Sequence, residues 1–357
     1  MLHYTHERSF GCRLFECVHR GLRTVFLENE LLRVGILADK GSDIFQFLYK
    51  PLDVDFMFRT PWGVRDPRAF VPTTYTDISA FLDFYEGGWQ DCLPTGGDPC
   101  DYLGFPFGAH GETPTIPWEY RIEEDTHERI AVRLWVRTYR TPFLVEKTVA
   151  LERGRGVLQV RERVTNEGRV PMDLMWGQHP AFGPPFVDDS CVIDLPGARV
   201  HCTNLQANTR FAEGVYTWPA VPARAGGTID LRHIPGAEAD TGDTIRLDQM
   251  PEGWYALTNT RLRVGFGMAW PLRVFPALWF WQVYGGNYGP PWYGRTYNIA
   301  LEPFSTIRST LAEALQDGSA HHLEPGASLE ADFVAVAYAG VEGVSRVTPD
   351  GKVTARD

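Results

Sequence analysis

Residues 157–165, VLQVRERVT, form a β-rich run in which apolar and polar side chains interleave, and Asn166-Glu167-Gly168 follows directly. Interleaving with a period of two is typical of a strand with one face buried. Asn and Gly favour tight turns, and another apolar run begins at Met172. We therefore expect a β-hairpin that turns at residues 166–168, with Gly168 at positive φ. This stretch predicts an antiparallel sheet.

The same pattern recurs along the chain, where short β-rich runs are separated by Gly, Pro, Asn and Asp. Helical periodicity is nearly absent, and its best instance is residues 305–316, in which Leu311 and Leu315 share a face. The sequence thus predicts an all-β protein of mostly antiparallel strands with few short helices. The clearest expected strands are residues 31–37, 44–49, 130–138, 143–151, 157–165, 172–177, 278–284, 297–302 and 329–338.

Some expected strands are too apolar for a sheet that is wetted on one face. Leu134-Trp135-Val136 is such a run, so a second sheet should cover it. A chain of 357 residues can form one large β domain. We assign residues 1–347 to a single sandwich domain and residues 348–357 to a polar C-terminal tail.

Composition narrows the classes of partner. The formal net charge of −11 repels nucleic-acid backbones and favours a neutral ligand over an anionic one. No apolar run approaches the roughly 18 residues that a membrane span needs, and no secretory signal is visible at the N-terminus. The six cysteines lack zinc-knuckle spacing, and no glycine-rich nucleotide motif occurs. We expect a cytoplasmic protein with buried free thiols, bound neither to membrane nor to nucleic acid.

Three distant stretches each end an apolar run with one ionisable group: His110, His179 and Glu302. Two imidazoles and a carboxylate at strand ends suit proton transfer at an uncharged polar substrate. Aromatic residues make up 13% of the chain, and many lie near Gly or Pro. Flat rings offer apolar area against which sugar C–H groups stack, and the loop residue Trp292 is the best candidate for that role.

Four segments together resemble the aldose 1-epimerases, or mutarotases, of the galactose mutarotase-like group. Residues 87–94, GGWQDCLP, are similar to the first conserved segment of that family, and His110-Gly111 is similar to the His-Gly that soon follows it. Residues 177–182, GQHPAF, resemble the second histidine motif. Residues 278–284 with 299–303, IALEP, resemble the last two site strands. The matching order extends over about residues 25 to 338.

The resemblance implies a β-supersandwich with a carbohydrate site on one sheet, no cofactor and no metal. It implies that Glu302 is the catalytic base and His179 the catalytic acid, with His110 as a substrate-binding and polarising group. The remaining candidates for binding substrate hydroxyls lie in or near the same motifs. They are Glu112, Gln178, Asp91, Trp292, Gln282 and, as a positional match only, Asp248.

The chain departs from the family at residues that bind the sugar. The usual Asn-Arg pair after the first motif is replaced by Thr95-Gly96-Gly97-Asp98, and the usual aspartate has no clear counterpart. Glu112 follows the first histidine where an aromatic residue and an arginine are more common. These changes favour a sugar other than galactose or glucose.

The sequence therefore predicts a cofactor-independent isomerase of carbohydrate metabolism that interconverts the α and β anomers of a free, neutral aldose or aldose derivative. Three alternatives stay open. One is a noncatalytic carbohydrate-binding protein of the same fold, another is a sugar epimerase acting at a different carbon, and the third is a metalloenzyme that uses the His and Glu side chains as ligands. The expected partner is a small carbohydrate, and a homodimer is compatible with the sequence.

Overall fold

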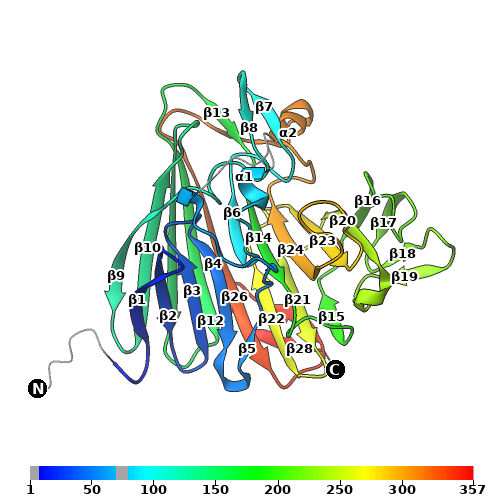
Figure 1. The fold of residues 1–357 in the computed structure, drawn as a ribbon, viewed down its shortest axis with the longest axis horizontal. Coiled ribbons are helices and arrows are strands. Elements are labelled where there is room, and N and C mark those ends of the chain that lie inside the picture. The colour runs from blue at the N-terminus through cyan, green and yellow to red at the C-terminus, as the bar shows by residue number, and fades with distance from the viewer. Residues whose placement is uncertain (1–7, 70–78, 357) are drawn as a thin grey trace, which may run out of the picture.

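The computed structural model describes residues 8–69 and 79–356 (Figure 1). Two large antiparallel sheets pack face to face, and short strand pairs and helices lie at their ends. The all-β prediction is confirmed. None of the helices in the described ranges is long and apolar enough to cross a membrane.

The larger sheet runs through most of the molecule (Figure 1). Its strand order does not follow the chain: β6 lies beside β14, which lies beside β24. Segments far apart in the sequence therefore become neighbours at its centre. In spatial order it comprises β1 (Arg13–His19), β2 (Leu22–Glu28), β3 (Leu32–Leu37), β4 (Asp43–Tyr49), β6 (Trp89–Cys92), β14 (Gly177–Phe182), β24 (Tyr297–Phe304), β23 (Ala277–Tyr284), β20 (Thr241–Asp248), β16 (Arg199–Cys202), β17 (Gly214–Thr217), β18 (Ala220–Pro222) and β19 (Thr228–Asp230), with β5 (Val54–Asp55) paired to β4.

The second sheet covers one face of the first. Its order is β15 (Cys191–Asp194), β21 (Trp254–Asn259), β22 (Val264–Ala269), β26 (Ser328–Ala339), β12 (Val157–Asn166), β11 (Phe143–Glu152), β10 (Arg129–Arg137) and β9 (Glu119–Asp125). Further pairs are β7 (Cys100–Tyr102) with β8 (Phe105–Phe107), β13 (Met172–Leu174) with β25 (His321–Leu323), and β27 (Val344–Val347) with β28 (Val353–Ala355). The helical segments are η1 (Lys50–Leu52), η2 (Pro67–Ala69), α1 (Ser79–Leu82), η3 (Ala237–Ala239) and α2 (Leu311–Asp317).

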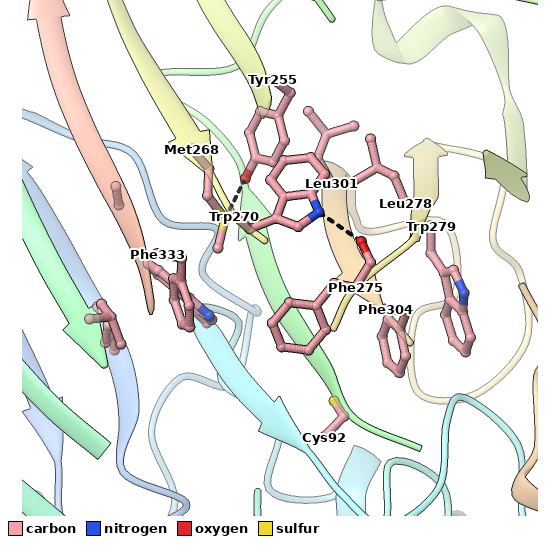
Figure 2. Packing of buried hydrophobic residues seen from close by; sticks show 14 of the residues in the cluster. Cys92, Tyr255, Met268, Trp270, Phe275, Leu278, Trp279, Leu301, Phe304 and Phe333 are labelled. Carbon is pink, nitrogen blue, oxygen red and sulfur yellow. Dashed lines mark hydrogen bonds between the residues drawn. The ribbon is translucent and has the colours of Figure 1, made fainter. Parts of the chain in front are cut away.

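Aromatic and aliphatic side chains fill the space between the two sheets (Figure 2). The ring of Phe182 on β14 lies 4.8 Å from that of Phe266 on β22, and Trp89 on β6 lies 6.0 Å from Phe333 on β26. These contacts define the inner face of the larger sheet, which includes Trp89 and Phe182. Because side chains alternate along a strand, the neighbouring residues of β6 and β14 point to the outer face, away from the second sheet.

The expected hairpin at residues 166–168 is wrong. Strand β12 pairs with β11 and β26, whereas the run after the turn forms β13, which pairs with β25. Gly168 is not at positive φ; its N–H donates instead to Asn166 Oδ1 at 2.9 Å, and the Asn166 amide donates to the carbonyl of Leu323. An Asx turn therefore directs the chain out of the sheet at a point where a β-turn would have reversed it.

Two further expectations need correction. The helix expected at residues 305–316 begins only at Leu311, because Thr310 accepts the N–H of Glu313 and forms a capping box with it. Residues 348–356, expected as a polar tail, fold back so that β28 pairs with β27, and Arg356 forms an ion pair with Asp194 at 2.5 Å. Val344 and Val347 of this hairpin belong to one buried cluster with Trp254 and Val336 of the second sheet.

Candidate active site

One row of side chains crosses the outer face of the larger sheet. Strand register places Gln90 opposite His179, Trp279 opposite Glu302, and Arg246 opposite Trp279. His201 on β16 lies opposite Arg246 and completes the row. Six strands from four distant parts of the chain thus contribute one residue each at the same level of the sheet.

His179 and Glu302 face each other where the pairing of β14 with β24 is interrupted. The two strands pair at Gly177 with Phe304 and at Ala181 with Ala300, so the intervening register sets His179 opposite Glu302. Pro180 and Pro303 follow these two residues and have no N–H to give to a ladder. His179 Nε2 lies 3.7 Å from Glu302 Oε1, and both side chains are buried.

His110 reaches the same place from a loop after β8. It has a φ of 61°, and Gly111 has a φ of 76° with no room for a side chain, since a Cβ there would lie 2.2 Å from the carbonyl oxygen of Leu93. The His110 N–H donates to the Gly96 carbonyl at 2.6 Å. The His110 ring centroid lies 5.0 Å from that of His179, nearly perpendicular to it.

The thiol of Cys92 sets the hydrogen bonding of His110. Cys92 Sγ lies 3.4 Å from His110 Nδ1. Burial raises the pKa of the Cys92 thiol well above its usual value, while burial, His179 and Arg246 hold the pKa of His110 well below its usual value. Both groups are therefore neutral near pH 7. Since an imidazole nitrogen is a better acceptor than a thiol sulfur, we assign the S–H as donor to Nδ1, which leaves the proton of His110 on Nε2.

These groups line a cavity of about 860 Å³. One wall is aromatic: the ring of Trp281 lies 5.8 Å from that of His179 and 5.7 Å from that of Trp292. Tyr85, which follows α1, lies 5.6 Å from His179, and Phe81 lies 4.3 Å from His110. The cavity thus combines flat apolar walls with a few polar groups, as ligand sites for small molecules do.

Burial moves the pKa values of the facing pair in opposite directions. It raises the pKa of Glu302 to about 8, against which Arg246 acts weakly, and it lowers the pKa of His179 to about 4. Between these two values the pair holds one proton, which resides on Glu302 when no ligand is present. Glu302 Oε2 and His179 Nδ1 have no hydrogen-bond partner. Buried polar atoms are rarely left so, and such exceptions cluster at functional sites.

Of the residues predicted from the sequence, the structure brings four together. His110, His179, Glu302 and Trp292 all line the cavity. Asp248 lies at its edge, where it pairs with the lining residues Arg199 and His201.

The other four predicted residues do not line the cavity. Asp91 and Gln178 point to the inner face, where the Gln178 amide donates to Asp91 Oδ1 at 2.9 Å. Gln282 also points inward and accepts a hydrogen bond from Arg210. Glu112 accepts the backbone N–H groups of residues 139–141 and so fixes the loop between β10 and β11. Asp91, Gln178 and Gln282 each adjoin a residue whose side chain points outward. Because side chains alternate along a strand, a difference of one residue places a side chain on the opposite face of the sheet.

Sequence reasoning missed Arg246, Tyr85 and Phe81 as lining residues. For Arg246 a signal was present, because the strand sequence TIRLD sets it between the core residues Ile245 and Leu247. Its alternation predicts that Arg246 faces away from the core. Tyr85 and Phe81 precede the first motif by only a few residues, but no periodicity distinguishes them from core aromatics.

Residues 19–334 match the model of the family described as a "Domain of unknown function (DUF4432)". The chain belongs to this family. The matched range spans both sheets and includes every residue of the row. No curated protein matches the chain.

Solved structures show the fold of this family member. A provisionally assigned aldose 1-epimerase from Klebsiella pneumoniae has a TM-score of 0.71 at 14% identity, over 92% of this chain and 87% of that one. A galactose mutarotase related enzyme from Lactobacillus acidophilus gives 0.58 at 18%, over 88% and 97%. A galactose mutarotase-like protein from Lactobacillus casei gives 0.54 at 17%, over 88% and 100%. The chain therefore has the galactose mutarotase-like fold.

The structure also bears on the metal-dependent alternative. Among residues 8–69 and 79–356, no group of three or more His, Cys, Asp or Glu side chains is arranged to hold a metal ion.

Proposed function

We propose that this protein interconverts the α and β anomers of a free aldose or aldose derivative, as an isomerase without a cofactor. The observation that carries the proposal is the facing pair His179 and Glu302, 3.7 Å apart, which share one proton inside an aromatic-walled cavity. The galactose mutarotase-like fold supports it, as does the similarity to a provisionally assigned aldose 1-epimerase and to a galactose mutarotase related enzyme.

Anomer interconversion needs one base and one acid on the two oxygens of C1. The base removes the proton of the C1 hydroxyl while the acid protonates the ring oxygen, and the bond from C1 to the ring oxygen breaks. Rotation about the bond from C1 to C2 then presents the other face of the aldehyde, and the reverse steps close the ring. We assign the base to Glu302 and the acid to His179.

This assignment needs the charge-separated form of the pair, a Glu302 carboxylate and a His179 imidazolium. The empty site favours the neutral form, because burial penalises both charges. Both forms contain the same single proton, so no proton has to enter or leave when substrate binds. Sugar hydroxyl groups donating to Glu302 Oε2, which is otherwise unpaired, would favour the carboxylate.

His110 has a supporting role in this mechanism. With Nδ1 bound to the Cys92 thiol, its Nε2–H is available to donate to the ring oxygen or to a neighbouring hydroxyl group. A neutral imidazole avoids placing a second cation beside His179. The rings of Trp281 and Trp292 would stack on the apolar face of the sugar and hold C1 near the pair.

The test is anomer exchange measured by polarimetry and by NMR exchange spectroscopy on a panel of freshly dissolved sugars. Wild type should equilibrate at least one sugar faster than buffer, and Glu302→Gln and His179→Asn should not. Glu330→Gln is the matched control, because Glu330 is exposed on β26 and far from the row. Equal rates for wild type and the Glu302→Gln, His179→Asn double variant on every sugar would refute the proposal.

Binding without exchange separates the noncatalytic alternative. If a sugar raises the melting temperature of wild type but its anomers do not equilibrate faster, the protein is a carbohydrate-binding module. Isotope exchange at a ring carbon other than C1 would instead indicate an epimerase of different regiochemistry.

A further inference from the structure

Arg246 is a cation in the floor of the cavity that has no anionic partner. Its guanidinium stacks on Trp279, with Cζ 3.8 Å from the ring centroid. Nη2 donates to Ser309 Oγ at 3.4 Å, and Nε and Nη1 have no hydrogen-bond partner. Among the residues that the structure describes, no carboxylate oxygen lies within 4.0 Å of it. Burial lowers the pKa of Arg246 to about 10, which leaves it charged at neutral pH.

The nearest carboxyl groups do not neutralise this charge. Glu302 is protonated in the empty site at neutral pH, as its raised pKa requires. Glu313 already accepts the N–H groups of Ser309 and Thr310 in the cap of α2. Asp98 lies at the mouth of the cavity and is exposed to water.

Two other arginines and a histidine that line the cavity differ from Arg246 in this respect. Arg199 and His201 both pair with Asp248, at 2.6 Å and 2.9 Å. Arg308 pairs with Asp317 at 2.5 Å. These three basic residues therefore contact two carboxylates, Asp248 being shared by Arg199 and His201, whereas Arg246 contacts none.

We infer that Arg246 binds an oxyanion substituent of the substrate, a carboxylate or a phosphate ester carried by the sugar that the row binds. A fixed guanidinium presents its N–H groups in a fork that fits such oxyanions, and the partner would supply the missing countercharge. This inference deepens the proposed function and rests on it for the position of C1 near His179 and Glu302.

The register of the sheet sets the distance between Arg246 and Glu302. Arg246 on β20 and Glu302 on β24 are separated by β23, so their backbones lie two strand spacings, roughly 10 Å, apart. Trp279 lies between them on the same face. A monosaccharide with its anomeric centre at Glu302 would therefore span this distance and direct a substituent distant from C1 toward Arg246.

An acidic substituent differs from the neutral ligand expected from net charge. A formal charge of −11 describes the field of the whole molecule, which slows the approach of anions. It says nothing about a single unpaired guanidinium inside a cavity, where short-range contacts decide which ligand binds.

The experiment compares matched neutral and acidic sugars: glucose with glucuronate and glucose 6-phosphate, and galactose with galacturonate and galactose 6-phosphate. Anomerisation rates and thermal-shift affinities are measured for wild type, Arg246→Gln, Arg246→Lys and the exposed control Arg161→Leu. One acidic class should have the higher kcat/KM and raise the melting temperature at lower concentration than its neutral counterpart. The carboxylate and phosphate arms show which substituent the site accepts.

For the preferred acidic sugar, Arg246→Gln should lower kcat/KM about 10- to 100-fold, mainly through KM. The same variant should lower kcat/KM for neutral sugars by a smaller factor than for the acidic sugar, and Arg246→Lys should recover part of the acidic-sugar loss. Equal losses on neutral and acidic sugars, or a wild type that prefers the neutral member of each pair, would overturn the inference. If Arg246→Gln does not fold, that preference in the wild type and its decline with added salt decide the question.

The two proposals fail in different ways. If acidic sugars bind through Arg246 but no sugar is anomerised, the proposed function is wrong and the oxyanion site stands. If neutral sugars are anomerised and Arg246→Gln changes nothing, the function stands and the oxyanion site is wrong.

Discussion

Around β6 and β14, both faces of the larger sheet carry buried polar residues. The two sets differ in how many of their polar atoms have hydrogen-bond partners. On the inner face Asp91 pairs with Lys147 at 2.5 Å, and Gln178 donates to Asp91 and to Glu162. On the outer face, His179 and Glu302 keep polar atoms without partners. A buried polar cluster that satisfies itself stabilises the fold, whereas one that does not is available to a ligand. The inner cluster bonds most of its polar atoms and leaves Glu162 Oε1 without a partner, whereas in the outer pair each residue keeps one unpartnered atom that faces the cavity region.

The largest effect should come from removing the outer-face pair. Glu302→Gln and His179→Asn should each lower kcat/KM about 10²- to 10⁴-fold, and the double variant should lose about as much as either single one, because the residues act as a unit. Their free energies of unfolding in urea should not fall. A double variant that keeps wild-type kcat/KM would contradict this prediction. So would variants whose free energy of unfolding falls together with kcat/KM, because the outer pair would then be structural like the inner cluster.

The inner face should respond in the opposite way. Lys147→Met leaves Asp91 and Glu162 buried without their cation. The free energy of unfolding should fall by about 3–5 kcal/mol, while kcat/KM of the folded fraction changes less than threefold. Urea unfolding of this variant beside the exposed control Lys352→Met tests it. Unchanged stability would show that the cluster contributes nothing to the fold.

The pH dependence of stability sharpens the comparison. Because the folded pKa of Glu302 is about 8 and its unfolded pKa about 4.5, the unfolded state loses this proton first as pH rises, and stability from this group falls between those values. Glu302→Gln removes that fall. The unfolding free energy of the variant relative to wild type should therefore rise by about 2–3 kcal/mol from pH 5 to pH 8. Glu330→Gln should show no such trend.

The pH–rate profile should reflect the shared proton. Below the His179 pKa of about 4 both groups are protonated and no base remains; above the Glu302 pKa of about 8 both are deprotonated and no acid remains. We expect a plateau of kcat/KM between these values with a decline on each side, assigned to the pair as a whole. If kcat/KM still rises at pH 9, the proposal that His179 and Glu302 together hold a single proton is contradicted.

The smallest effect should come from the contact between Cys92 and His110. Cys92→Ala removes the donor to Nδ1 and should lower kcat/KM by up to about tenfold, whereas Cys92→Ser, which keeps a donor, should stay within about threefold of wild type. Nitrogen-15 NMR of the His110 ring should report the Nε2–H tautomer in wild type and in Cys92→Ser, and a mixture in Cys92→Ala. A single tautomer in all three would show that Cys92 does not position this histidine.

The sequence by itself determined the class of fold and several of its longer strands, among them β10, β11, β12 and β26. Alternation of side chains and frequent turn residues predicted the antiparallel sheets, and the motif order indicated His110, His179 and Glu302, which the structure brings to one cavity. The hairpin after Thr165 was mispredicted because local turn chemistry cannot tell whether the chain reverses or leaves the sheet.

Only the tertiary structure decided which polar residues face the cavity. Alternation states that Gln178 and His179 lie on opposite faces, but both are buried and both are polar, so the sequence does not say which face the second sheet covers. The pairing of β14 with β24 and of β20 with β23, between segments far apart in the chain, sets His179 opposite Glu302 and places Arg246 two strands away. Register, burial and the missing countercharge of Arg246 are properties of packed neighbours, and for that reason the sequence indicated candidate residues while the fold decided which of them face the cavity.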